Sequence, residues 1–461
     1  MIQSILAPAL LWLAMLAVCP LYAQQAEEQN LGSLWPRVEE YYPGVAAKTS
    51  AIDAAAYHQQ AVQGRMLPHV YAQAQNTYGT YAGSAGAFFP QAGFFNVSGL
   101  TQPLAGSTTA ANTFASALVQ WEVFSFGKLR KEREAAGALF HQSVSDKETY
   151  LLQLKKILSE RYISLLYNHA KWAWTAKNAE RLDDIRHITA TLSASGLRPA
   201  ADSLLASSSY VQALGEHDKW SGLRQAAYIH LAELHGTDTV DYTASAQRFG
   251  NPAEMPSHPM IPRNAHHPML EVLNQQQAYY KASGEAQKRA SLPSIHLLGG
   301  YAYRGTGIGP NGTVSGAWAD GFSHTTNNVL AGIGITWNLT NLHINRLQGA
   351  QRFKEAERIQ FMHARYERAL QADLSASQAK IRQQYKQLQK TSRGVQQAQD
   401  AYRMYLARYK SGLITLSELL QIRLLLEQAE NTHIEASRDY WMLRADEAEQ
   451  TADFEFLFNN L

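Results

Sequence analysis

The sequence repeats itself at a constant offset of 216 residues. Trp121 and Trp337 close two similar runs, ALVQW and GITW, and 337 − 121 = 216. The tripeptides Ser195-Gly196-Leu197 and Ser411-Gly412-Leu413 are identical and have the same offset, since 412 − 196 = 216. Further pairs at this offset are Leu204 with Leu420, Asp202 with Glu418, and His217 with His433. This period is far longer than a solenoid unit, so the sequence indicates two large copies of one unit.

The N-terminus predicts an export signal. Residues 5–18 are an apolar run too short to favour a membrane-spanning helix, and Leu21-Tyr22-Ala23 is followed by polar residues. We therefore expect residues 1–23 to be a signal peptide. Cys19 is the only cysteine, so no intrachain disulfide forms. The alternative at this position is lipidation of Cys19, because Leu16-Ala17-Val18-Cys19 resembles a lipobox.

Two stretches almost free of charge predict a sheet that meets lipid. Residues 66–121 contain no Asp, Glu, Lys or Arg, and residues 292–341 contain only Arg304 and Asp320. Charges cost little on a wetted sheet but much against lipid, which disfavours the alternative of a soluble glycine-rich sheet. Each strand predicted here is long enough to cross a bilayer, which takes about 9–11 residues. The predicted strands are residues 69–81, 112–123, 294–304 and 328–339, and the links 81–106 and 305–326 are expected to be extracellular loops.

Long charged helices are predicted to follow each pair of strands. Residues 128–195 and 345–411 are rich in Ala and Gln, and the first of them corresponds to about 100 Å of helix at 1.5 Å per residue. Glycine at a helix C-terminus favours a left-handed cap, so residues 195–197 and 411–413 are predicted tips of helical hairpins. The second long helix also has a seven-residue recurrence typical of a coiled-coil seam. Its members are Ile381, Leu388, Val395, Tyr402 and Tyr409.

The predicted organisation is therefore a duplicated α+β unit. A first repeat covers residues 24–236 and a second covers residues 269–461, each running helix, strand, strand, long helix, tip and returning helix. A proline-rich linker at residues 237–268 joins them. The net charge of +2 does not favour a nucleic-acid partner.

This chain resembles the outer-membrane efflux protein family, the TolC-like channels, over nearly all of its mature length. The resemblance rests on the duplicated order of elements, on Trp121-Glu-Val-Phe-Ser-Phe-Gly127, and on Tyr409-Lys-Ser-Gly412-Leu-Ile-Thr-Leu-Ser-Glu418-Leu-Leu. It implies an α+β membrane protein, a homotrimer whose 12-stranded β-barrel in outer-membrane lipid continues as a periplasmic α-helical barrel. Physical reasoning also favours a trimer, because four strands cannot close a barrel and open edges are not tolerated in lipid.

The function implied by the resemblance is that of an exit duct. Such a duct serves a tripartite efflux or type I secretion system, taking substrate from an inner-membrane pump through a periplasmic membrane-fusion adaptor. It catalyses no reaction and needs no cofactor. The alternative that the residues leave open is an exported periplasmic coiled-coil scaffold or binding protein.

Site residues follow from the same resemblance. Those implied to contact the adaptor are Gly196, Leu197, Gly412 and Leu413, and those implied to hold the periplasmic entrance shut are Asp202, Tyr409 and Glu418. Two positions depart from the family pattern, since Ile414 replaces an arginine and Gln421 replaces an acidic residue. The alternative interpretation makes the two acids first-turn residues favoured by the helix dipole, and Tyr409 a seam residue.

No convincing catalytic or metal-binding group is found in the sequence. The run Gly307-Ile-Gly309-Pro-Asn-Gly312 matches a dinucleotide fingerprint formally, but no helix is predicted after it, so a loop is expected. The linker histidines are expected to be solvated rather than metal ligands, and the returning-helix histidines to lie on the helix surface. They are His258, His266 and His267 in the linker, and His217 and His433 on the helices.

Overall fold

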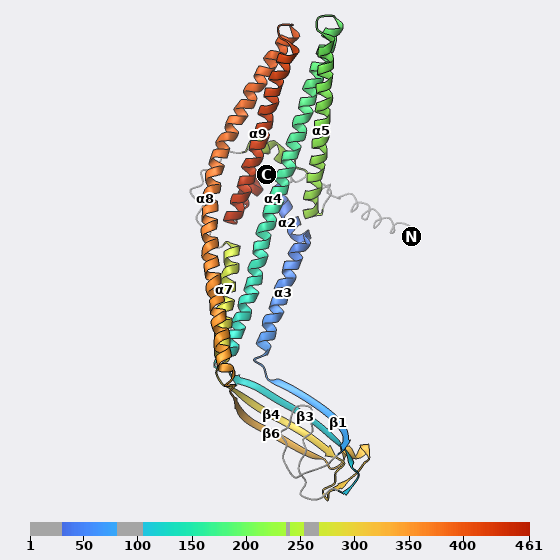
Figure 1. The fold of residues 1–461 in the computed structure, drawn as a ribbon, viewed down its shortest axis with the longest axis vertical. Helices are drawn as coiled ribbons and strands as arrows, with labels where there is room; N and C mark the ends of the chain where they lie inside the picture. Colours follow the sequence, from blue (N-terminus) through green and yellow to red (C-terminus); the bar gives the residue numbers. More distant parts are fainter. Residues whose placement is uncertain (1–29, 81–104, 237–239, 253–266) are drawn as a thin grey trace, which may run out of the picture. The chain divides into compact units, whose positions relative to one another are not determined.

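The structure is a computed structural model that describes residues 30–80, 105–236, 240–252 and 267–461. The predicted signal peptide and Cys19 lie outside the described residues, so neither cleavage nor lipidation is tested. Two compact units divide the chain. The hairpin unit contains Met1–Ala47, Lys147–Pro268 and Glu367–Leu461, and the sheet unit contains Lys48–Asp146 and Met269–Tyr366. Figure 1 shows the elements of both units.

A four-stranded antiparallel sheet forms the centre of the sheet unit, in the order β1-β3-β4-β6. Its strands are β1 (His69–Thr80), β3 (Thr109–Phe124), β4 (Ser294–Thr306) and β6 (Thr326–Thr336). A parallel pair, β2 (Ala105–Gly106) with β5 (Thr313–Val314), and the 3-10 helix η1 (Trp318–Phe322) were not expected from the sequence. The sheet is open within one chain, because β1 and β6 each pair on one side only.

The two faces of this sheet differ in polarity. Strand register places Ala117 opposite Tyr301 and Tyr301 opposite Val329, so these residues share a face. That face carries aliphatic and aromatic side chains, many of them exposed: Val70, Val119, Trp121, Leu297, Tyr301, Val329, Ile333 and Ile335. The opposite face is mixed: it carries polar side chains such as Gln73, Gln75, Ser116, Gln120, Arg304 and Asn328, together with the apolar residues Tyr71, Phe114, Leu118, Leu298 and Leu330. Val329 is 83% exposed and Ile333 is 74% exposed, so none of the described residues covers the part of the apolar face that these two occupy.

The last predicted strand is shorter than expected. It ends at Thr336 rather than at residue 339, because Asn338 accepts a hydrogen bond from the backbone N–H of Asn341 at 3.1 Å and so starts the next helix. The two tryptophans that revealed the repeat have equivalent roles. Trp121 Nε1 donates to the carbonyl of Met66 at 2.8 Å, and Trp337 Nε1 donates to that of Ser291 at 3.0 Å. Each indole therefore fastens a strand to the segment that precedes its partner strand.

Helices account for the rest of the described chain. The two hairpins are α4 (Lys128–Ala194) with α5 (Ala200–His235), and α8 (Asn341–Lys410) with α9 (Leu416–Thr451). The other helices are α2 (Leu31–Tyr41), α3 (Pro43–Gly64), α6 (Thr243–Gly250), α7 (Pro268–Arg289) and α10 (Glu455–Asn460). Among the residues described, no helix is long and apolar enough to cross a bilayer.

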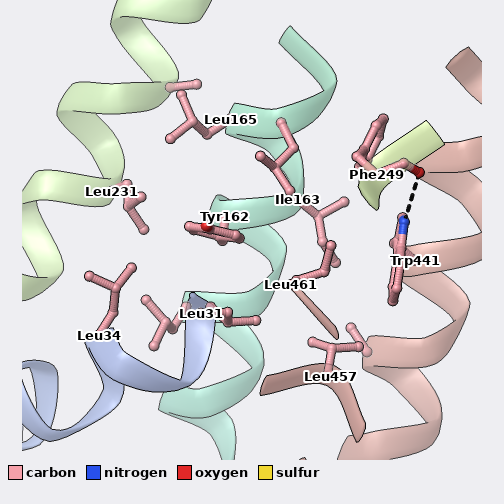
Figure 2. Packing of buried hydrophobic residues seen from close by; sticks show 14 of the residues in the cluster. Leu31, Leu34, Tyr162, Ile163, Leu165, Leu231, Phe249, Trp441, Leu457 and Leu461 are labelled. Atoms are coloured by element: carbon pink, nitrogen blue, oxygen red, sulfur yellow. Dashed lines mark hydrogen bonds between the residues drawn. The ribbon is translucent and has the colours of Figure 1, made fainter. Parts of the chain in front are cut away.

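One hydrophobic core contains residues of eight helices: α2, α3, α4, α5, α6, α8, α9 and α10. Figure 2 shows Leu31, Tyr162, Leu231 and Trp441 converging from α2, α4, α5 and α9, with Leu457 and Leu461 beside them. Helix α6 adds Phe249, whose carbonyl accepts a hydrogen bond from Trp441 Nε1 at 3.0 Å. The segment predicted as a linker therefore contains a packed helix, because an aromatic side chain within it reaches this core.

The heptad row of α8 is buried against helices of the same chain. Ile381 and Leu388 belong to the core around Trp441, while Tyr402 and Tyr409 belong to a second cluster near the tips. The recurrence therefore marks the face on which α8 packs within its own chain.

Candidate functional site

The hairpin tips lie together at one end of the hairpin unit (Figure 1). At the first tip the N–H of Leu197 donates to the carbonyl of Leu192 at 2.9 Å, and Gly196 has a φ of +73°. At the second tip the N–H of Leu413 donates to the carbonyl of Arg408 at 2.9 Å, and Gly412 has a φ of +76°. Both are Schellman caps, which need a residue that tolerates a left-handed backbone, and glycine does so without strain.

The four predicted adaptor-contact residues form an open surface at these tips. Leu197 is 71% exposed and Leu413 is 69% exposed. A Cβ built on Gly196 or Gly412 would have no neighbouring atom within 4 Å. The two exposed leucines lie beside two glycines that have no neighbouring atoms, which leaves room for a helix from another protein to approach.

Glu418 closes the first turn of α9 with a capping box. Its Oε2 accepts hydrogen bonds from the N–H of Thr415 at 2.7 Å and from the Thr415 hydroxyl at 2.9 Å, and its own N–H donates to Thr415 Oγ1 at 3.3 Å. These bonds to Thr415 hold the pKa of the Glu418 carboxyl below its usual range. The carboxylate is exposed, so the residue is both a helix cap and a persistent negative charge on the tip.

Asp202 lies in the first turn of α5, where its N–H donates to the Pro199 carbonyl at 3.1 Å. Within the described part of the chain, its carboxylate forms no hydrogen bond or ion pair. The described structure therefore shows no hydrogen bond between Asp202 and Tyr409, two of the three residues that the resemblance groups at the entrance.

Tyr409 is fully buried between the two hairpins. Its hydroxyl lies 3.0 Å from Thr189 Oγ1 on α4, and Thr189 itself donates to the carbonyl of Ile185 at 2.7 Å. The single hydroxyl proton of Thr189 is thus used, which makes Tyr409 the donor of the other bond. The tyrosine ties the second hairpin to the first through a threonine rather than an acid.

Arg198 is a tip residue that the sequence interpretation missed. Its guanidinium donates to the carbonyl of Ile414 and lies over the ring of Tyr409, 5.3 Å from the centroid. Since 414 − 198 = 216, Arg198 stands at the position of the first repeat that is equivalent to Ile414. The arginine expected on the second tip is found on the first, and the constant offset was the signal that could have located it.

Below the tips, a polar ladder joins α4 of the first hairpin to α9 of the second. Arg181 binds Glu430 with two bonds of 2.8 and 2.6 Å, Asn178 Nδ2 donates to Glu427 at 3.0 Å, and Lys171 Nζ donates to Glu435 at 3.2 Å. Burial lowers the pKa of Lys171 despite its contact with Glu435. At Arg181 burial lowers the pKa, but the bonds to Glu430 together with the attraction of Glu430, Tyr402 and Glu427 raise it overall. These pairs are far apart in sequence, so no local spacing revealed them.

The sequence predicts that the two histidines at equivalent repeat positions lie on the helix surface. In the structure, each of them instead faces a threonine of the neighbouring helix. His217 Nδ1 lies 3.3 Å from Thr175 Oγ1, and His433 Nδ1 lies 3.1 Å from Thr391 Oγ1. Both pairs obey the offset, since 391 − 175 = 216 and 433 − 217 = 216. Burial lowers the pKa of His433. Each hairpin thus contains the same threonine–histidine bond between its two helices.

Among the described residues, neither the linker histidines nor the run Gly307–Gly312 forms a metal-binding or nucleotide-binding site. His267 is buried rather than solvated, and burial lowers its pKa against the opposing influence of Glu449. His258 and His266 lie outside the described residues. Within the described ranges no three His, Cys, Asp or Glu residues are grouped as metal ligands. Gly307–Gly312 forms a turn, in which the N–H of Gly312 donates to the carbonyl of Gly309 at 3.0 Å. The short strand β5 follows it directly, rather than a helix.

Comparison with known proteins shows which family and which solved structures this chain resembles. A sequence model of the family described as Outer membrane efflux protein matches residues 264–442. No curated protein matches the chain by sequence. The fold is shared with solved structures, and this family and these structural relatives are channel proteins rather than enzymes.

Three of those structures illustrate the likeness. The Campylobacter jejuni CmeC outer membrane channel has a TM-score of 0.73 at 15% identity, over 92% of this chain and 85% of that one. The outer membrane protein VceC from Vibrio cholerae gives 0.72 at 14%, over 92% and 97%. The outer-membrane channel OprN gives 0.71 at 16%, over 91% and 89%. All three have the mostly helical fold with a small antiparallel sheet.

Proposed function

We propose that this chain, which the model of the outer membrane efflux protein family matches over residues 264–442, belongs to that family and is the outer-membrane exit duct of a tripartite efflux or type I secretion system. Substrate passes from an inner-membrane pump, through a periplasmic adaptor, into the duct and out of the cell. The observation that carries the proposal is the sheet with one face that is apolar along its length and an opposite face that contains nearly all of its polar residues, both nearly free of charge. Such a sheet suits lipid on one side and a watery lumen on the other.

Three copies would complete the sheet as a 12-stranded barrel. In one chain β1 and β6 are open edges, and unpaired backbone groups are not tolerated in hydrocarbon. Head-to-tail pairing of β6 with β1 of the next copy removes both edges by a cyclic contact. The apolar residues then face lipid, with Trp121 and Trp337 near one interface and Tyr301 further along the strands.

The same symmetry supports a closed ring of helices. Within the chain, α9 binds α4 through Glu427 and Glu430. The equivalent positions of α5 are Val211 and Leu214, because 427 − 216 = 211 and 430 − 216 = 214, and these apolar side chains are exposed. An interface of the α9–α4 type between copies would place α5 of one chain on α8 of the next. This contact would cover the exposed row on α5, which also includes Leu204 and Ile229.

In this trimer the tips are the periplasmic entrance and the adaptor contact. Leu197 and Leu413 are the exposed apolar residues, and Gly196 and Gly412 let an adaptor helix come close. Three copies of Glu418 give a ring of ionised carboxylates, which favours cations and restricts passage. Asp202 adds first-hairpin charge, while Tyr409 holds the hairpins together from within.

Paired charge insertions test this proposal. Ile333→Arg places a charge on the apolar face of β6 and should cost about 2–4 kcal/mol per chain near the bilayer midplane. Leu330→Arg, on the opposite face of the same strand, should still assemble and conduct. Outer-membrane fractionation, particle mass corrected for detergent, and conductance in planar bilayers are the measurements. A soluble periplasmic monomer that tolerates both substitutions equally would favour the scaffold and reject the duct.

A further inference from the structure

The sheet face that contains Gln75 carries one arginine, Arg304, that forms no ion pair with any described residue. The four long strands contain only two residues of the types Asp, Glu, Lys and Arg, namely Glu122 and Arg304. Register places Arg304 opposite Phe114 on β3 and Thr326 on β6, on the face shared with Gln75. Arg304 precedes the end of β4 by two residues, so it lies close to the loop end of the sheet.

Each carboxylate of this region is otherwise engaged. Glu122 pairs with Lys128, whose Nζ lies 3.2 Å from Oε1. Asp320 on η1 accepts a hydrogen bond from the hydroxyl of Ser315. The links at residues 81–108 and 307–325 contain no other Asp or Glu. Across the described residues, Arg304 has no ion pair.

We propose that Arg304 biases the strand-lined part of the duct toward anionic solutes. This inference rests on the proposed trimer, in which three guanidinium groups stand at one level of the lumen. A guanidinium stays protonated throughout the physiological pH range, and rings of arginine favour anions in pores. This bias toward anions applies to the strand-lined part of the duct. It opposes the preference for cations that the Glu418 ring gives the entrance.

The test is the chloride-to-potassium permeability ratio of the purified full-length protein. The ratio comes from reversal potentials across a KCl gradient in planar bilayers of uncharged lipid. Arg304→Gln should lower it by about twofold or more, since a ring of three positive charges is removed from the lumen. Arg304→Lys keeps the charge and should retain the wild-type ratio. Thr326→Glu sets a carboxylate opposite Arg304 and should lower the ratio without altering the arginine.

The outcomes separate this inference from the proposed function. Unchanged ratios in Arg304→Gln and Thr326→Glu, with normal single-channel conductance, would overturn the role of Arg304 and leave the duct intact. Should Arg304→Gln fail to assemble, an unchanged ratio in Thr326→Glu, which leaves the arginine in place, would still overturn the role of this level of the lumen. Absence of conductance in the wild-type protein would reject the duct itself, and the anion bias with it.

Discussion

Tyr409 on α8 donates a hydrogen bond to Thr189 on α4, and 3.0 Å separates the two hydroxyl oxygens. Both side chains are fully buried, so water replaces neither partner. The bond crosses from the second hairpin to the first, and it lies beneath the ring-stacked Arg198. Side chains inside one chain therefore hold its two tips together, and any widening of the proposed entrance must loosen them.

Removal of the tyrosine hydroxyl tests this tie. Tyr409→Phe keeps the ring in its cluster but loses the hydrogen bond, which should cost about 0.5–1.5 kcal/mol of stability. We expect a lower thermal unfolding temperature in detergent and a higher mean conductance in planar bilayers. Tyr57→Phe, at an exposed tyrosine, is the matched control and should change neither. Identical unfolding of Tyr409→Phe and wild type would show that the bond contributes nothing.

The Arg198 clasp should hold the tips more directly. Arg198→Gln removes both the cation over the Tyr409 ring and the charge-assisted bond to the Ile414 carbonyl. We expect faster backbone hydrogen exchange at residues 411–414 and more frequent open events in bilayer recordings. Arg403→Gln, at an exposed arginine of α8 whose ion pair among the described residues is with Asp400, controls for loss of a positive charge. Equal exchange rates in the two variants would argue against the clasp.

Sequence reasoning located the hairpin tips and the four strands because the patterns that mark them are long. The offset of 216 identified both tips, and the absence of charge identified the four strands, since both patterns extend over many residues. It placed the end of the last strand beyond Thr336 because it could not foresee that Asn338 caps the next helix. Nor could it find the bonds of Lys171 or Arg181, whose partners lie on α9, because such pairs follow only from the packing of two distant helices.

The acidic ring at the tip can be doubled. Gln421 stands where the family pattern allows a second acid, so Gln421→Glu should add a second ring of three carboxylates in the proposed trimer. We expect trivalent cations added on the tip side to block Gln421→Glu at lower concentrations than wild type, and Glu418→Gln at higher concentrations. Glutamine at position 418 can still accept the Thr415 N–H, so the cap is kept. Block that is equal in all three proteins would remove Glu418 from the conduction path.

The buried histidine of the second hairpin makes stability depend on pH. Burial lowers the pKa of His433 below its ordinary value of 6.5, so the unfolded chain takes up a proton at a higher pH than the folded one. Stability is therefore complete above about pH 6.5 and falls as the pH decreases toward the folded-state pKa. His433→Gln should weaken this fall, and thermal unfolding in detergent at pH 7.5 and 5.5 measures it. The matched control is His58→Gln, at an exposed histidine of α3.

A fall smaller than that of wild type, rather than its disappearance, is the expected result for His433→Gln. Burial also lowers the pKa of His169, His235 and His267, so these three groups add losses of the same sign. Thr391→Val offers a second approach, because it removes the hydroxyl that faces His433 Nδ1 at 3.1 Å and leaves the imidazole in place. This variant should be less stable than wild type at pH 7.5 already, while its fall toward pH 5.5 persists. If His433→Gln showed the full wild-type fall, the acid sensitivity would belong to the other histidines.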